Sequence, residues 1–268
     1  MVRLISWNVA RRAQALVQQA AAVGAREPDV LALQEVTART RPLWAAACAT
    51  LGLPHVRCSL DDADPARAPA GPRRHGVLLA SRAPLDPAAA LAVPWPESAL
   101  ALRTGALEVH VVHVPNAANG LIKPETLAAM RAGLAARRDA PVVACGDWNT
   151  PRRELPDGTV WSFARDGKGR LRDERAGFWD DAELGVVPGL AELGYADAFR
   201  SLHGYASREP SWAWRHGGGW RLDHVMCSGA LEPVAATYHH AWRLDGLSDH
   251  SALEVDLVVR SSPSAEGR

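Results

Sequence analysis

The stretch Val142-Val-Ala-Cys-Gly-Asp-Trp-Asn149 opens with an apolar run and closes on a carboxylate and an amide. A short apolar run of this kind predicts a buried strand, so Asp147 and Asn149 are expected at the end of one. Three other motifs also place acidic or histidine side chains beside an apolar run: Leu33-Gln-Glu35, Trp220-Arg-Leu-Asp-His224 and Ser248-Asp-His250. Strands that share a sheet can bring such groups together from distant positions. We therefore expect one cluster of polar side chains at the edge of a sheet.

The remaining periodicity predicts more strands than helices. The expected helices are Arg12–Val23, Arg41–Leu51, Pro124–Ala136 and Asp180–Leu193. The expected strands are Val2–Trp7, Val30–Leu33, His55–Cys58, Gly76–Ala80, Leu100–Arg103, Ala106–Val114, Val142–Cys145, Arg221–Cys227, Val234–His240 and Ala252–Val259. This mixture of local hairpins and crossover helices favours an α/β fold in which mixed sheets are covered by helices.

The length and composition of the chain favour one large domain. Its 268 residues are 47% hydrophobic, which is enough for a sizeable core. We expect a single domain over residues 1–260, because no stretch has the length and composition of a linker. Asp61–Pro72 is expected to be a surface loop, and residues 261–268 a flexible tail.

Charge and cysteine content bear on partners and location. The 30 Lys and Arg side chains balance 30 Asp and Glu, so the chain lacks the overall positive charge that draws a protein to nucleic acid, although a local basic patch remains possible. Cys48, Cys58, Cys145 and Cys227 lie in no metal-ligand spacing, which favours a reducing setting. The chain opens directly into a strand, and no run approaches membrane-spanning length. We expect a cytoplasmic protein without membrane contact.

The residues of the cluster suit a metal ion with hard oxygen ligands. Mg²⁺ or Mn²⁺ commonly takes only one or two carboxylates from the protein and keeps several waters. Glu35 and Asp249 would supply the carboxylates, and Asn8 would supply a neutral oxygen. The sequence thus predicts Mg²⁺ or Mn²⁺ as the cofactor.

The other polar residues suit the attack of water on a phosphodiester. Such a reaction needs a base, a cation that offsets charge developing on the phosphate, and a group that orients. Asp147, His250 and Asn149 could fill these roles. Asp223 is expected to accept a hydrogen bond from one ring nitrogen of His250, which would keep the imidazole charged and aimed.

These residues resemble the endonuclease/exonuclease/phosphatase superfamily, nearest to its exonuclease III-type abasic-site endonucleases. The resemblance covers nearly the whole chain. It rests on Ser6-Trp-Asn-Val9, Leu33-Gln-Glu35, His113-Val-Pro-Asn116, Gly146-Asp-Trp-Asn149, Ala196-Asp-Ala-Phe-Arg200, Trp220-Arg-Leu-Asp223 and Ser248-Asp-His250. It implies a four-layer α/β sandwich with two mixed β-sheets flanked by helices, as in pancreatic deoxyribonuclease. It also implies hydrolysis by direct attack of water, with no covalent intermediate.

The same resemblance implies roles for individual residues. Glu35 would be the principal metal ligand, with Asn8 and Asp249 beside the metal, and Asp147 the base or the group that orients water. Phosphate contacts would come from Asn149, His250 and Asn116, while His113 stands where abasic-site endonucleases carry a tyrosine. Trp212, Trp220 and Leu222 would form the wall that surrounds a flipped sugar. Whether Asp147, His113 or His250 takes the proton stays open.

The chain departs from the abasic-site pattern at three positions. Ala10 and Thr37 replace an acidic residue and a lysine, and Asn119 stands where one branch has an arginine that enters DNA. DNA at abasic sites or 3′ ends is the favoured substrate. The alternatives are an enzyme that hydrolyses a small phosphorylated molecule and a binding protein without catalytic activity. We expect a monomer, and we expect part of the charged loop after Asp147, around Gly158–Gly169, to form a lid or substrate wall.

Overall fold

The computed structural model describes residues 1–61, 70–175, 177–214 and 216–260. The predicted tail, 261–268, lies outside the described residues, as does most of the predicted loop, 62–69.

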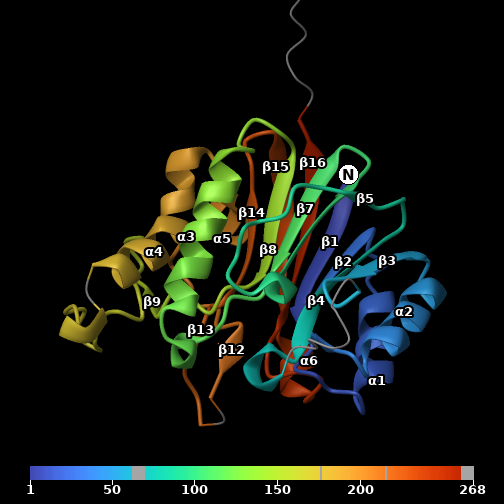
Figure 1. The fold of residues 1–268 in the computed structure, drawn as a ribbon, viewed down its shortest axis with the longest axis horizontal. Coiled ribbons are helices and arrows are strands. Elements are labelled where there is room, and N and C mark those ends of the chain that lie inside the picture. Colours follow the sequence, from blue (N-terminus) through green and yellow to red (C-terminus); the bar gives the residue numbers. More distant parts are fainter. Residues whose placement is uncertain (62–69, 176, 215, 261–268) are drawn as a thin grey trace, which may run out of the picture.

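The first sheet has six strands in the order β15-β16-β1-β2-β4-β3. Its strands are β1 (Val2–Asn8), β2 (Val30–Thr37), β3 (His55–Cys58), β4 (His75–Ser81), β15 (Leu231–His239) and β16 (Ala252–Val259). Only β1 and β2 pair in parallel, and the other neighbouring strands of this sheet are antiparallel. Helices α1 (Leu16–Gly24) and α2 (Arg41–Thr50) lie on its outer side (Figure 1).

The second sheet also has six strands, in the order β11-β14-β8-β7-β6-β5. Its strands are β5 (Asp86–Pro87), β6 (Ala99–Thr104), β7 (Leu107–Val112), β8 (Val142–Asp147), β11 (Ala196–Asp197) and β14 (Asp223–Cys227). Here β7 and β8 are the parallel pair. Helices α3 (Ile122–Ala135) and α4 (Phe178–Val186) cover the face turned away from the first sheet (Figure 1).

Three apolar cores hold these layers together. Residues alternate between cores along each strand: in β4, Val77 and Leu79 face the core between the sheets, whereas Leu78 and Ala80 face α1 and α2. The third core lies between the second sheet and α3 and α4. Strands covered on both faces read as continuous apolar runs. The structure confirms the predicted four-layer α/β sandwich with two mixed sheets.

Shorter elements complete the chain. The short strands are β9 (Arg153–Glu154), β10 (Val160–Trp161), β12 (Trp212–Ala213) and β13 (Gly219–Trp220), and the short helices are α5 (Ala198–His203) and α6 (His240–Leu244). The 3₁₀ helices are Gly71–Arg73, Pro96–Ser98, Ala117–Asn119, Asp173–Arg175 and Gly189–Leu193.

Several predicted boundaries were wrong. The helix expected over Asp180–Leu193 is two elements, because α4 ends at Val186 and Pro188 stands before a separate 3₁₀ helix. Proline restricts the residue before it to non-helical conformations, which separates the two. The first helix begins at Leu16 rather than Arg12. The strand expected to reach His240 stops at His239, where α6 begins.

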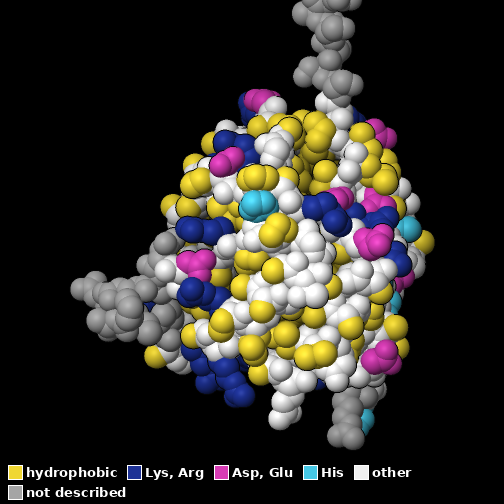
Figure 2. Space-filling model, turned by 90° about the vertical axis from the view of Figure 1, so that its right-hand side faces the viewer, with side chains coloured by type: hydrophobic (Ala, Val, Ile, Leu, Met, Phe, Trp, Pro, Cys, Tyr) yellow, Lys and Arg dark blue, Asp and Glu magenta, His cyan; other side chains and the backbone are white. Residues whose placement is uncertain are grey.

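The four cysteines, Cys48, Cys58, Cys145 and Cys227, are all described, buried and free of disulfides. Among the described residues, no helix combines the length and hydropathy needed to cross a membrane. Figure 2 shows one face of the molecule, on which acidic and basic side chains are interspersed toward the top and sides, around a centre of hydrophobic and uncharged side chains.

Candidate active site

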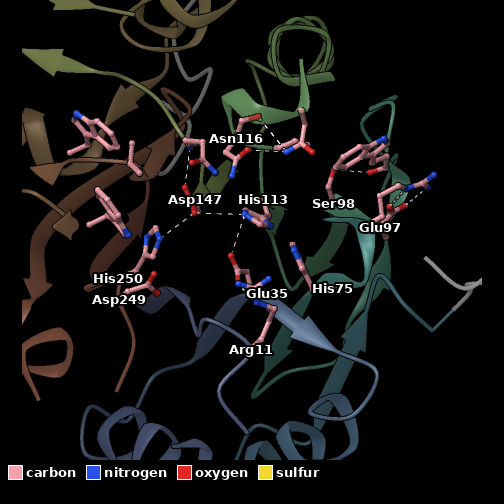
Figure 3. Close-up of a pocket in the computed structure, with 18 residues that line it drawn as sticks. Arg11, Glu35, His75, Glu97, Ser98, His113, Asn116, Asp147, Asp249 and His250 are labelled. Carbon is pink, nitrogen blue, oxygen red and sulfur yellow. Dashed lines mark hydrogen bonds and ion pairs between the residues drawn. The ribbon is translucent and has the colours of Figure 1, made fainter. Parts of the chain in front are cut away.

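One cavity of about 370 Å³ opens at the strand ends where the two sheets approach each other. Its lining includes most of the residues predicted from the sequence: Glu35, His113, Asn116, Asp147, Asn149, Trp212, Trp220, Leu222, Asp249 and His250. Asn8 and Asp223 are buried and contact lining residues through hydrogen bonds. The strands thus bring the expected side chains to one place (Figure 3).

Glu35 lies in a β-bulge of β2. The register with β4 shifts between Leu33 and Val36, and Glu35 itself has φ +60°. A bulge inserts an unpaired residue that changes where a side chain points. Left-handed backbone is costly for a residue other than glycine and is concentrated at functional sites. The bulge presents the Glu35 carboxylate to the cavity.

Asn8, at the end of β1, connects two carboxylates. Its Nδ2 donates to Asp147 Oδ2 at 3.0 Å and to Glu35 Oε1 at 3.4 Å. Its Oδ1 accepts the Ala10 N–H at 2.9 Å. The oxygen expected to face a metal thus accepts one backbone hydrogen bond, and the amide nitrogen holds Asp147 and Glu35 in place.

Asp147 ends β8 and is almost completely buried. Its Oδ1 accepts the backbone N–H of Asn149 at 3.0 Å, and the Asn149 side chain donates to the Val114 carbonyl at 2.8 Å. Burial raises the pKa of Asp147 to about 7, although the nearby His250 imidazole opposes the shift. A carboxyl group with a pKa near neutrality is well matched to proton transfer.

His250 is held by Asp223, as the sequence predicted. Its Nδ1 lies 2.8 Å from Asp223 Oδ2, and its Nε2 lies 3.6 Å from Asp147 Oδ2. Burial lowers the pKa of His250, but Asp223 and Asp147 outweigh it and raise the value to about 10. The imidazole is therefore a cation at neutral pH. Asp223 does not pair with Arg221, which bonds Glu154 and Asp197 instead.

His113 lies between the carboxylates of Glu35 and Asp147. Its Nε2 is 3.9 Å from Glu35 Oε1 and 3.7 Å from Asp147 Oδ2. Burial lowers the pKa of His113 to about 4, against the opposing effect of Glu35, so this ring is neutral at physiological pH. For Glu35, burial favours a higher pKa, but the imidazoles of His113 and His75 and the guanidinium of Arg11 lower it below its ordinary value.

Two further predicted residues lie at the rim of the cavity. Asp249 is exposed and lines the cavity, but it joins neither of the two tight groups of metal-binding side chains. Asn116 caps the 3₁₀ helix that follows it, and its Oδ1 accepts from Ala118 N at 3.1 Å and from Asn119 Nδ2 at 3.0 Å.

One wall of the cavity is aromatic. The rings of Trp212 and Trp220 stack with centroids 5.2 Å apart and an interplanar angle of 13°. Trp212 also forms a backbone bridge to His250, and Ser251 N donates to Ser211 O at 2.7 Å. The aromatic wall is thus tied to the backbone of the histidine that faces Asp147.

The opposite wall was not anticipated from the sequence. Arg73 pairs with Glu97, and its guanidinium carbon lies 5.6 Å from the centroid of the Trp95 ring. Ser98, in the same segment, accepts the backbone N–H of His113 at 2.8 Å. No motif marks these residues, because the chain around Trp95 belongs to a loop before β6.

His75 and Arg11 were also missed. His75 is the first residue of β4, and its ring centroid lies 5.0 Å from that of His113. Arg11 Nε lies 2.8 Å from Glu35 Oε2. Among the described residues, the segment 158–169, expected to form a lid, contributes none of the lining residues, and Thr150 and Phe163 of the same loop hydrogen-bond the buried Glu183.

The residues around Glu35 fit a divalent metal ion. His75 Nδ1 is buried without a hydrogen-bond partner among the described residues, whereas Glu35 Oε2 pairs with the exposed guanidinium of Arg11. An unsatisfied buried polar atom costs about 1–3 kcal/mol, which a bound cation would offset. The ligand atoms of Glu35, His75 and His113 lie within 4.8 Å of one another, as do those of Asp147, Asp223 and His250.

The chain belongs to the Endonuclease/Exonuclease/phosphatase family, whose model matches residues 5–250. The family comprises phosphoesterases, and the family membership predicted from the motifs is confirmed. No curated protein matches the chain in sequence.

Solved structures share the fold. An AP endonuclease from Archaeoglobus fulgidus superposes with a TM-score of 0.73 at 21% identity, covering 97% of this chain and 100% of its own. The 3′-5′ exonuclease NExo from Neisseria meningitidis gives 0.68 at 20% identity, covering 95% and 98%. A 3′ phosphatase structure of NExo from Neisseria, bound to a product DNA hairpin, gives 0.67 at 19% identity, covering 96% and 100%.

Proposed function

We propose that this protein is a divalent-metal-dependent phosphodiesterase that hydrolyses DNA at abasic sites or 3′ ends by direct attack of water. The observation that supports the proposal most is the arrangement of Asp147. This carboxylate lies on the floor of the cavity, between the cationic His250 at 3.6 Å and the Glu35 group, to which Asn8 connects it. A base, a cation and a metal-binding carboxylate thus face one space.

Each residue of the floor has a task in this mechanism. Asp147, whose pKa burial raises to about 7, orients the water and accepts its proton. The His250 cation offsets charge that develops on the phosphate, and Asp223 keeps it protonated and aimed. A divalent ion held at Glu35, with Asp249 at the rim, would polarise the phosphate oxygen. Asn149 and Asn116, which line the cavity, would contact the phosphate.

The aromatic wall supports a nucleic-acid substrate. The stacked rings of Trp212 and Trp220, with Leu222 beside them, offer an apolar surface next to the floor. Such a surface can stack on a base or enclose a flipped sugar. The solved structures that share the fold include an AP endonuclease and a 3′ phosphatase bound to DNA.

A second candidate is hydrolysis of a small phosphorylated molecule. The net charge of zero favours it, and so does Asn119, which hydrogen-bonds Asn116 at the position where one branch carries an arginine. The two candidates differ in salt dependence. Binding of DNA should weaken steeply with added salt through counterion release, whereas binding of a small substrate with few charge contacts should respond less.

The deciding experiment compares two labelled duplexes that differ only by one synthetic abasic site. Each is incubated with Mg²⁺ or Mn²⁺, with chelator, and with the variant Asp147→Asn. Asp139→Asn is the matched control, because that side chain is 96% exposed and lies outside the cavity. Metal-dependent incision at the abasic site, lost in Asp147→Asn alone, is the expected result.

Other results would revise the proposal. If neither duplex is cut but an aryl phosphodiester is hydrolysed, hydrolysis of a small phosphorylated molecule replaces DNA hydrolysis as the proposed function. If nothing is hydrolysed and no divalent ion binds, the protein is a binding protein without catalytic activity.

A further inference from the structure

We propose that His75 and His113 join Glu35 as metal ligands, and that this nitrogen-rich site selects Mn²⁺, Co²⁺ or Zn²⁺ over Mg²⁺. The inference rests on the proposed function, because it concerns the same cavity. It adds the identity of the metal and a ligand, His75, that no sequence motif indicates.

Three elements from both sheets bring the donors together. Glu35 comes from the bulge in β2, His75 starts β4 beside it, and His113 follows β7 of the second sheet. Their ligand atoms lie within 4.8 Å of one another, and His113 Nε2 lies 3.9 Å from Glu35 Oε1. Figure 3 shows the three side chains converging on one side of the cavity floor.

Within the described part of the chain, no hydrogen bond from the ring of His75 or His113 explains the position of either imidazole. His75 Nδ1 is buried without a partner among the described residues. The nearest carboxylate oxygens to His113 Nε2 lie beyond hydrogen-bond distance, at 3.7 and 3.9 Å. By contrast, the buried His224 bonds Asp197 and the Thr150 carbonyl through its two nitrogens. Both ring nitrogens of His224 are therefore satisfied, whereas His75 keeps a buried nitrogen free to bind a ligand beside Glu35. His110 Nδ1 is also buried without a partner among the described residues, but His110 does not line the cavity.

The donor chemistry determines which ion binds. Mg²⁺ requires oxygen donors in near-octahedral geometry and dehydrates reluctantly. Imidazole nitrogen suits first-row transition metals and zinc, and affinity rises from Mn²⁺ to Co²⁺ across the series. Two imidazoles beside one carboxylate therefore favour a transition metal or zinc. Arg11, which pairs with Glu35 Oε2 and is 43% exposed, can turn toward solvent when the ion binds.

The test measures metal binding directly. Wild-type protein, His75→Ala and His75→Asp are titrated with Mg²⁺, Mn²⁺, Co²⁺ and Zn²⁺ by calorimetry. Visible absorption of bound Co²⁺ and pulsed electron paramagnetic resonance of bound Mn²⁺ report coordinated imidazole nitrogen. His55→Ala is the matched control, because His55 begins β3 of the same sheet and lies outside the cavity. Circular dichroism checks that each variant folds.

We expect wild-type protein and His55→Ala to bind Co²⁺ and Zn²⁺ more tightly than Mg²⁺. His75→Ala should lose roughly tenfold or more in affinity for Co²⁺ and Zn²⁺, with little change for Mg²⁺. His75→Asp, which replaces nitrogen by oxygen, should shift the preference toward Mg²⁺. Nitrogen modulation of bound Mn²⁺ should weaken in both variants.

Two results would overturn the inference. If both variants keep the wild-type order of affinities and the nitrogen signal, His75 is not a ligand, although metal-dependent hydrolysis could still stand. If wild-type protein binds none of the four ions, both this inference and the proposed function fail.

Discussion

Asp147 is the residue on which the polar contacts of the cavity converge. It accepts hydrogen bonds from Asn8 and Asn149 and faces His250 and His113. We expect Asp147→Asn to lower kcat by roughly a thousandfold or more, because it removes the proton acceptor. Steady-state hydrolysis of a phosphodiester, with circular dichroism to verify the fold, measures the effect. A loss under tenfold would exclude Asp147 as the base.

The hydrogen bond between His250 and Asp223 predicts coupled effects. We expect His250→Gln to lower kcat by about a hundredfold or more, because a preorganised charge at the phosphate is lost. Asp223→Asn should cause a similar loss, since the imidazole loses the carboxylate that keeps it charged and aimed. The double variant should be no slower than His250→Gln alone, as expected for residues that act as a unit. Additive losses would show that Asp223 acts independently of His250.

The sequence was sufficient for polar residues that end apolar runs and fit known motifs. Asp147 ends β8 as expected, Asp223 begins β14 and His250 precedes β16, whereas Glu35 lies within β2 at its bulge rather than at the end of the strand. His75, the first residue of β4, and Arg73 could not be found in this way, because they belong to no recognised motif and only the tertiary fold brings them to the cavity. The orientation of the Asn8 side chain could not be predicted from the sequence either, because it depends on a hydrogen bond from the Ala10 backbone N–H.

Among the elements, β9 is tied to the rest of the fold by a buried network of charges. Glu154 bonds Arg221 at 2.6 Å and Arg200 of α5 at 2.7 Å, and its side chain is only 6% exposed. Burial would raise the pKa of Glu154, but the two guanidinium groups outweigh it and lower the value to about 2 from 4.5. The carboxylate therefore stabilises the folded state at neutral pH.

This network predicts a pH dependence of stability. Because the folded-state pKa is depressed, the contribution of Glu154 is complete above pH 4.5 and is lost as pH falls toward 2. We expect Glu154→Gln to reduce the free energy of unfolding at pH 7 by about 3 kcal/mol. The difference from wild type should shrink below pH 4.5. Urea unfolding at a series of pH values tests this, and a difference independent of pH would contradict it.

Sequence periodicity located the long elements better than their ends. The apolar runs of β4, β8 and β16 were recognisable because both faces of each strand are buried. The bulge in β2 could not be predicted from the sequence pattern, because it arises from a shift in the pairing between β2 and β4. Helices α5 and α6 were missed because six and five residues are too short to show a helical period.

At the scale of the whole molecule, the apolar core between the two sheets predicts that both sheets unfold together in one cooperative transition. Leu79 of β4 and Val225 of β14 belong to the same buried cluster, although they lie in different sheets. We expect Leu79→Ala to lower the free energy of unfolding by about 2–5 kcal/mol through lost burial and the cavity left behind. Tryptophan fluorescence and far-ultraviolet circular dichroism should still report a single coincident transition. Two separated transitions would show that the sheets unfold independently.

The overall architecture was predicted through the family resemblance, since apolar runs alone gave only mixed sheets covered by helices. The order of strands and the pairing of the two sheets depend on contacts between distant segments. Local sequence patterns therefore do not predict the strand order or the pairing of the sheets.

The two walls of the cavity have a consequence for how selectivity can change. The tryptophan wall shares a backbone bridge with His250, and the segment that carries Trp95 accepts the backbone N–H of His113. A mutation that reshapes either wall will therefore also shift a histidine of the floor. Laboratory evolution of this protein toward a new substrate should pass through slower intermediates, and recovery of rate should require compensating changes beside His113 or His250.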